Sequence, residues 1–128
     1  MAELKFRAWD KEENKMWNVE TLYIEDEWVK VNDGSIYGVT KDLIRSYCLM
    51  QSTGVTSIYD DNNTEIYEGD IVKTNSSPHG RFIGYVGDAV SRFEVRGVKQ
   101  YKGLKYDLDG SYVVIGNVHQ NPELLESD

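Results

Sequence analysis

Residues 70–120 contain five short apolar segments separated by turn residues, and this pattern restricts the possible folds more than any other feature of the chain. Within the segments, apolar and polar residues alternate or apolar residues run on, as in half-buried and buried strands. Strands this short and closely spaced can close around a small core, so the pattern predicts an SH3-like small β-barrel. Gly80, Gly84 and Gly116 would allow the close backbone approaches that such a barrel needs.

The segment at residues 66–72 (IYEGDIV) places a glycine and an acid just before the first of these strands. We expect Gly69 to adopt a positive φ and Asp70 to accept backbone N–H groups within the turn. Glu68 and Asp70 could instead form an acid–base pair, but this would require a cleft and separated pKa values. The turn already explains both residues, and we therefore interpret Gly69 and Asp70 as structural.

The first part of the chain also has strand patterns. Residues 4–9 and 16–24 alternate apolar and polar residues across a charged turn, which predicts a hairpin. A short strand is expected at 28–31, followed by a turn at 32–34 (NDG). Residues 40–46 could begin a helix capped by Thr40, whereas the pattern at 45–53 favours a strand.

Within the predicted barrel, residues 81–86 and 89–96 form the arms of a second hairpin, with Gly87 and Asp88 as its turn. Residues 99–108 form a further arm, and Asp109 and Gly110 a tight turn. The apolar run at 112–118 predicts a strand covered on both faces.

The end of the chain, residues 121–125 (NPELL), predicts a helical turn with Asn121 as its cap and Pro122 at its first position. Leu124 and Leu125 would then close one end of the barrel. The expected fold class is mainly β with little helix: an N-terminal hairpin or meander layer (1–65), then the barrel (66–125), in one compact unit.

The charge is distributed unevenly along the chain. The formal net charge is −8, which disfavours general attraction to nucleic acid or anionic membranes. Residues 1–70 carry 15 acidic and 7 basic side chains, whereas residues 71–106 carry 7 basic side chains and only two acids. The acidic half of one copy could therefore meet the basic barrel edge of another, giving a homo-oligomer.

The candidate partner or nucleic-acid surface lies within this basic stretch. Cations that neutralise phosphates and rings that stack on bases are typical of single-stranded nucleic-acid binding, and the same cations suit an acidic protein. A solvated charged face is the simplest alternative. The candidate residues are Arg92, Arg96, Lys99, Tyr101, Lys102 and Lys105.

The sequence lacks the patterns of common catalytic and metal sites. Cys48 is the single cysteine, and His79 and His119 are the only histidines, with no spacing that requires a metal. The acidic loop at 60–65 fails the EF-hand pattern, because a glycine and a later acid are not at the required positions. We therefore expect no catalytic, cofactor-binding or metal-binding residues, and no enzymatic activity.

Four sequence blocks resemble those of YopX-like phage and prophage proteins: residues 5–10 (KFRAWD) with Met16, 50–54 (MQSTG), 65–72 (EIYEGDIV) and 115–125 (IGNVHQNPELL). The resemblance covers nearly the whole chain and implies a mainly β protein with an SH3-like C-terminal part, encoded by temperate phages. It implies no established activity. Asn63 and Thr64 depart from the family's Asn-Gly turn, and the loop from Gly54 is a few residues longer.

These features predict a non-enzymatic interaction module that associates with itself or binds a host or phage protein. The alternative is a nucleic-acid-binding barrel that uses the basic strands at 81–105. The first residues lack a signal peptide and no apolar run is long enough to cross a membrane, so we expect the cytoplasm of a bacterial host.

Overall fold

The structure is a computed structural model that describes residues 5–35, 38–58, 64–74, 82–89 and 92–125. The fold is mainly β, as predicted, and forms two compact units, Met1–Gln51 and Ser52–Asp128. Its helical parts within these ranges are short 3₁₀ turns, namely η1 (Ile44–Ser46), η2 (Lys99–Tyr101) and η3 (Pro122–Leu125). No helix formed by the described residues could span a membrane.

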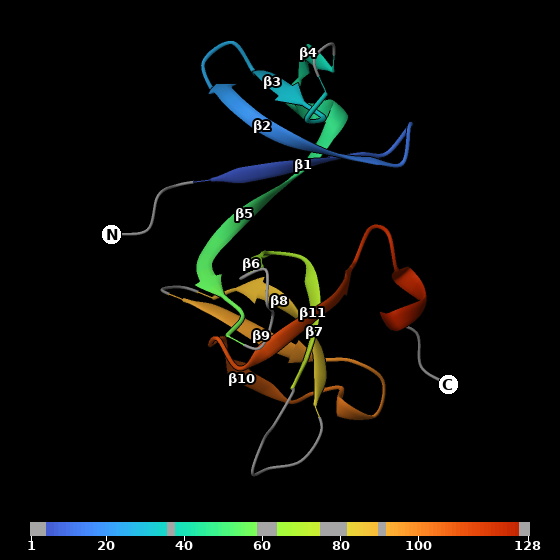
Figure 1. The fold of residues 1–128 in the computed structure, drawn as a ribbon. Helices are drawn as coiled ribbons and strands as arrows, with labels where there is room; N and C mark the ends of the chain where they lie inside the picture. The colour runs from blue at the N-terminus through green and yellow to red at the C-terminus, as the bar shows by residue number, and fades with distance from the viewer. Residues whose placement is uncertain (1–4, 36–37, 59–63, 75–81, 90–91, 126–128) are drawn as a thin grey trace. The chain divides into compact units, whose positions relative to one another are not determined.

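The first unit is an antiparallel sheet in the order β4-β3-β2-β1-β5 (Figure 1). Its strands are β1 (Phe6–Asp10), β2 (Lys15–Tyr23), β3 (Trp28–Asn32), β4 (Val39–Leu43) and the first half of β5 (Tyr47–Thr56). The predicted hairpin and the short strand after it are confirmed.

Apolar side chains from neighbouring strands meet on this sheet and form the core of the first unit. Ala8 and Trp17 are paired across β1 and β2, and Val31 and Val19 are paired across β3 and β2. Because strand side chains alternate between faces, such pairs place the apolar residues of successive strands together. The buried members are Ala8, Trp17, Val29, Val31 and Tyr47.

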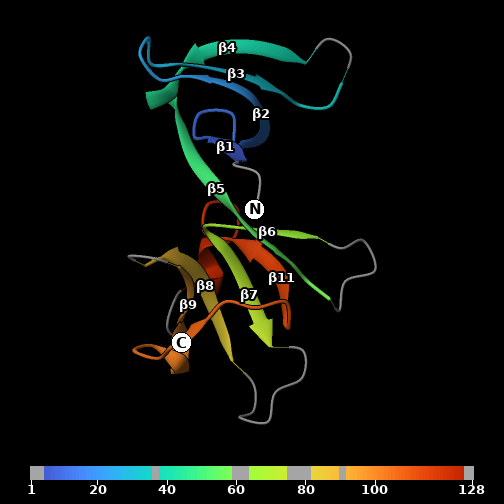
Figure 2. The same cartoon turned by 90° about the vertical axis from the view of Figure 1, so that its left-hand side faces the viewer.

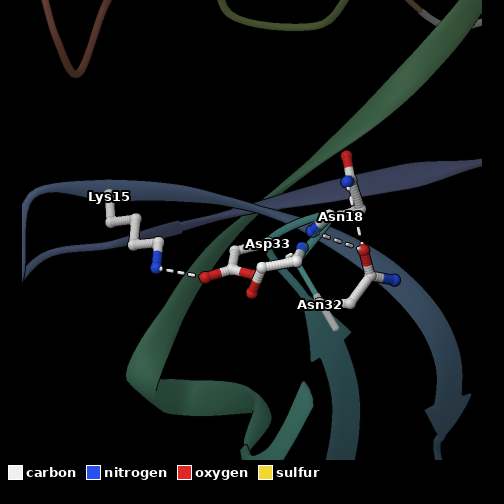
Figure 3. A network of polar contacts seen from close by, with 6 residues as sticks. Lys15, Asn18, Asn32 and Asp33 are labelled. Carbon is white, nitrogen blue, oxygen red and sulfur yellow. Dashed lines mark hydrogen bonds and ion pairs between the residues drawn. The ribbon is translucent and has the colours of Figure 1, made fainter. Parts of the chain in front are cut away.

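A polar network secures the end of β3 (Figure 3). Lys15 Nζ lies 2.8 Å from Asp33 Oδ2 and 4.2 Å from the centre of the Trp17 ring. The hydrogen bond from Lys15 holds the pKa of Asp33 well below its usual range, with a further contribution from Ser35. Asn18 Nδ2 donates to Asn32 Oδ1 at 3.2 Å. The network supports the predicted turn after β3, where Gly34 has φ 87°.

The helix considered for residues 40–46 is not formed. Thr40 and Lys41 lie in β4 and pair with Val31 and Lys30 of β3, and the 3₁₀ turn η1 follows. Pairing along the open edge of β3 satisfies the backbone groups of β4, so tertiary context overrides the local helix signal. The favoured strand at 45–53 forms as β5 and begins at Tyr47.

The second unit has an antiparallel five-stranded sheet in the order β10-β9-β8-β7-β11, of which β9, β8, β7 and β11 are labelled in Figure 2. The second half of β5 pairs with β6 (Glu65–Tyr67), and the sheet comprises β7 (Asp70–Thr74), β8 (Ile83–Asp88), β9 (Phe93–Gly97), β10 (Lys105–Asp107) and β11 (Tyr112–Asn117).

This sheet is open, so the predicted SH3-like closed barrel is not confirmed. Within the described ranges, β10 and β11 are its two edges and do not pair with each other. β10 is three residues long and exposed throughout, so it offers few backbone groups that could pair with another strand and close a barrel.

The core of the second unit draws on nearly every strand. Its buried residues are Ile66, Val72, Phe82, Val86, Val95 and Tyr112. Val55 of β5 packs against this cluster, so the end of β5 and β6 belong with the second unit. The chain therefore divides after Gln51, whereas the sequence pattern places the division after residue 65.

The Gly69–Asp70 turn has the predicted geometry. Gly69 has φ 89°, and the buried Asp70 accepts a hydrogen bond from Tyr67 N through Oδ2 at 2.8 Å. Gly69 N donates to Val86 O at 2.8 Å, and Val118 N donates to Gly69 O at 2.9 Å. The turn thus joins three parts of the second unit.

The turn of the β8–β9 hairpin lies later than predicted. Gly87 pairs with Glu94, and Asp88 pairs with Phe93, so both residues belong to the strand. A Cβ at Gly87 would lie 2.8 Å from Arg96 Cζ, so a larger residue here would have to displace the end of the arginine side chain. The predicted arm at 99–108 is also shorter, because residues 99–101 form η2 and only β10 is extended.

The last part of the chain largely follows the prediction. Asp109 Oδ1 accepts from Ser111 N at 2.8 Å in the expected turn, and η3 forms at the expected place. Asn121 Oδ1 accepts from Asn117 N at 3.2 Å. The middle of β11 is half-buried, so the expectation of cover on both faces is not met. His79, Gly80, Asn63 and most of the 60–65 loop lie outside the described residues.

Candidate binding cleft

A row of side chains crosses the outer face of the second unit's sheet. Tyr85, Arg96 and Lys105 are direct neighbours across β8, β9 and β10. Val86 and Val95, which are adjacent to two of them in sequence, lie in the core. Because side chains alternate along a strand, the row faces away from that core.

This row lines a cleft of about 510 Å³. The chain from η2 to β10 contributes Lys99, Lys102 and Lys105, and the apolar part of the lining is Val98, Leu104, Val118 and Leu125. The cleft lies entirely within the second unit, and its volume is in the usual range for ligand sites. It combines apolar surface with several cations.

The guanidinium of Arg96 already forms hydrogen bonds with other groups of the second unit. Its Nε donates to Glu94 Oε1 at 2.9 Å, and its Nη2 donates to the carbonyl of Asp88 at 2.8 Å. The hydrogen bond from Arg96 lowers the pKa of Glu94, with a smaller contribution from the charge of Lys105. Since Glu94 is buried and ionised beside it, Arg96 acts mainly as a fixed wall of the cleft.

The lysines carry the excess charge of the cleft. Within the described ranges, Lys99, Lys102 and Lys105 form no ion pair. Lys102 and Lys105 are exposed, whereas Lys99 is half-buried and has φ 56°. Three cations therefore surround an apolar lining, and none of them is in an ion pair in the described part of the chain, although the charge of Lys105 acts on Glu94.

Two of the six candidate residues from the sequence do not belong to the cleft. Tyr101 packs edge-to-face on Phe82, with ring centres 5.4 Å apart, and adds to the core. Arg92 Nε lies 2.7 Å from Asp107 Oδ1, on an exposed part of β10. The structure brings together the other four, Arg96, Lys99, Lys102 and Lys105.

Sequence reasoning missed most of the apolar lining. Leu125 was expected to close one end of a barrel, but it lines this cleft on the outer face of the sheet instead. Val98, Leu104 and Val118 gave no signal of a common site, because they come from three separate turns or strand ends.

The described residues show no arrangement suited to metal binding. No group of three or more His, Cys, Asp and Glu side chains among them could hold an ion. The known lining of the cleft contains no Ser, Cys, His, Asp or Glu side chain. The chemistry it offers is attraction of anions and burial of apolar groups.

Comparison with known proteins identifies a family and a similar solved structure. The model of the family described as YopX protein matches residues 5–126. A crystal structure of protein EF1440 from Enterococcus faecalis is similar, with a TM-score of 0.66 and 30% sequence identity, over 98% of this chain and 100% of that one. No curated protein matches.

Proposed function

The chain belongs to the YopX family, and we propose that it is a non-enzymatic module whose second unit binds a protein segment carrying acidic and apolar side chains. The observation that carries the proposal is the cleft with three lysines around an apolar lining. Apolar contact would supply most of the binding energy, and the lysines would select acidic partners and speed encounter.

The absence of paired acids or nucleophiles from the known lining supports binding over catalysis. General acid–base and nucleophilic mechanisms need such groups within reach of one another. Glu94, a carboxylate near Lys105, is buried and bound by Arg96, and it does not line the described part of the cleft.

Single-stranded nucleic acid is the second candidate, because cations and the Tyr85 ring share one cleft. The structure supports it less well than a protein segment. Tyr101 stacks on Phe82, and Arg92 and Arg96 are paired with carboxylates, so fewer groups are available to phosphates and bases. Binding of a labelled single-stranded oligonucleotide that weakens steeply with salt would favour this alternative.

We also propose a phage or prophage origin and a site of action in the bacterial cytoplasm. The support is the resemblance of four sequence blocks to phage-encoded YopX-like proteins.

Selection from a random peptide library tests the proposed function. We expect peptides with several acids beside an apolar residue, and on the order of tenfold weaker binding to the variant Lys102→Glu/Lys105→Glu. Lys11→Glu/Arg45→Glu is the matched control, since both residues are exposed, lie in the first unit and give the same charge change. Fluorescence anisotropy of selected peptides gives the affinities.

The proposal fails if no peptide binds, or if the cleft variant and the control bind the selected peptides equally. It also fails if oligonucleotides bind through the cleft and acidic peptides do not.

A further inference from the structure

The turn between β2 and β3 presents an exposed apolar residue beside consecutive acids. Ile24 is 77% exposed, the most exposed of the large apolar residues in the described ranges, and is followed by Glu25, Asp26 and Glu27, all exposed. Trp28, the next residue, is 42% exposed. Ile24 and Trp28 therefore leave apolar surface available for contact beside three carboxylates.

The backbone holds this turn in one shape. Glu27 adopts φ 60°, and its N–H donates to Ile24 O at 3.3 Å. Ile44 N in turn donates to Glu27 O at 2.9 Å, which ties the turn to η1. A fixed turn loses less conformational entropy on binding than a free segment does.

We propose that the cleft of one copy receives the acidic turn of a second copy, residues 24–28. The inference rests on the proposed function and names its partner. Three carboxylates beside one apolar side chain on the turn complement three lysines around an apolar lining in the cleft. The turn belongs to the first unit and the cleft to the second, so each copy carries both halves of the contact.

Such a contact is heterologous, because the two surfaces that meet are different. Repetition of it produces a closed ring if the rotation closes and a filament if it does not. Since the attraction depends on exposed charges, it should weaken at high ionic strength, where the screening length falls to about 3 Å at 1 M salt.

A mixing experiment tests the contact. The turn variant Glu25→Lys/Asp26→Lys keeps the cleft, and the cleft variant Lys102→Glu/Lys105→Glu keeps the turn. We expect wild type to assemble at low salt and each variant alone to stay monomeric. An equimolar mixture should assemble again, because the intact cleft meets the intact turn and the charge-reversed turn meets the charge-reversed cleft. Light scattering after size exclusion measures the masses, and far-UV circular dichroism checks that each variant is folded.

Lys5→Glu/Lys11→Glu is the control and should assemble like wild type, because both residues are exposed and lie outside the turn, η1 and the cleft. The inference is overturned if wild type is monomeric at low salt and at a protein concentration on the order of 10⁻⁴ M, or if the variants associate alone as wild type does. If acidic peptides bind the cleft but wild type is monomeric, this inference fails and the proposed function stands. If oligonucleotides bind the cleft instead of peptides and wild type is monomeric, both fail.

Discussion

Gly69 occupies a backbone position that other residues fill only with strain. Its φ of 89° lies where a Cβ is unfavourable, and its N–H and C=O both bond to other strands or turns. We predict that Gly69→Ala lowers the free energy of unfolding by about 1 kcal/mol or more, and that Gly69→Asn costs less because Asn tolerates positive φ better. Urea unfolding measures both, and equal stabilities of wild type and Gly69→Ala would contradict this account of the turn.

Tyr112 gives a test of burial in the second core. Burial, with a smaller contribution from the charge of Asp109, raises the pKa of Tyr112 to about 12. The folded state therefore favours the neutral phenol, and the stability it confers is complete below the unfolded pKa of about 10 and is lost as the pH rises through the folded value.

We predict that wild type loses up to about 2 kcal/mol more stability than Tyr112→Phe between pH 9 and 12. The comparison removes the contribution of the other tyrosines, which both proteins share. Denaturant unfolding across this pH range provides the measurement. Parallel pH profiles for the two proteins would show that Tyr112 ionises without cost and is not buried as described.

At the scale of elements, two glycines of β8 meet β9 in different ways. A Cβ at Gly84 would lie 2.5 Å from the backbone O of Arg96, whereas one at Gly87 would meet the end of the Arg96 side chain. The backbone cannot move without disturbing the ladder, but a side chain can. We predict that Gly84→Ala destabilises the protein by about 1–3 kcal/mol, and Gly87→Ala by less. Thermal unfolding ranks them, and the reverse order would refute the packing of this strand pair.

Strand patterns in the sequence predicted most elements, because alternation reflects one buried face. They failed where a neighbouring element decides the outcome. Thr40 and Lys41 have a local helix signal, yet the open edge of β3 draws them into β4. Gly87 and Asp88 have turn chemistry, yet both belong to β8, and Arg96 crosses Gly87. The residues that surround these positions in the sequence do not reveal that β3 and Arg96 are their partners.

The candidate site was predictable only where its residues are close together in the sequence. Lys99, Lys102 and Lys105 are close in sequence, so their clustering follows from the chain itself. The apolar lining depends on Val118 and Leu125, which reach the cleft through the path of β11 and η3. Tyr101 was expected on the surface, but no sequence pattern reveals that Phe82 covers its ring.

At the scale of the whole molecule, the net charge of −8 conceals a basic surface on the second unit and an acidic turn on the first. We predict that the apparent mass rises above the 14.7 kDa of one chain as protein concentration increases at low salt, and returns to it near 1 M salt. Sedimentation velocity at several salt concentrations checks this. Association that strengthens with salt would instead indicate a mainly apolar contact elsewhere.

Zero-length cross-linking of a mixture of unlabelled and ¹⁵N-labelled protein tests the central claim most directly, because it joins only amines and carboxylates already in contact. The account predicts mixed-isotope cross-links that join Lys102 or Lys105 to Glu25 or Asp26. If mixed-isotope cross-links join other surfaces, or if those lysines join only carboxylates of their own chain, the cleft does not bind the acidic turn of a second copy.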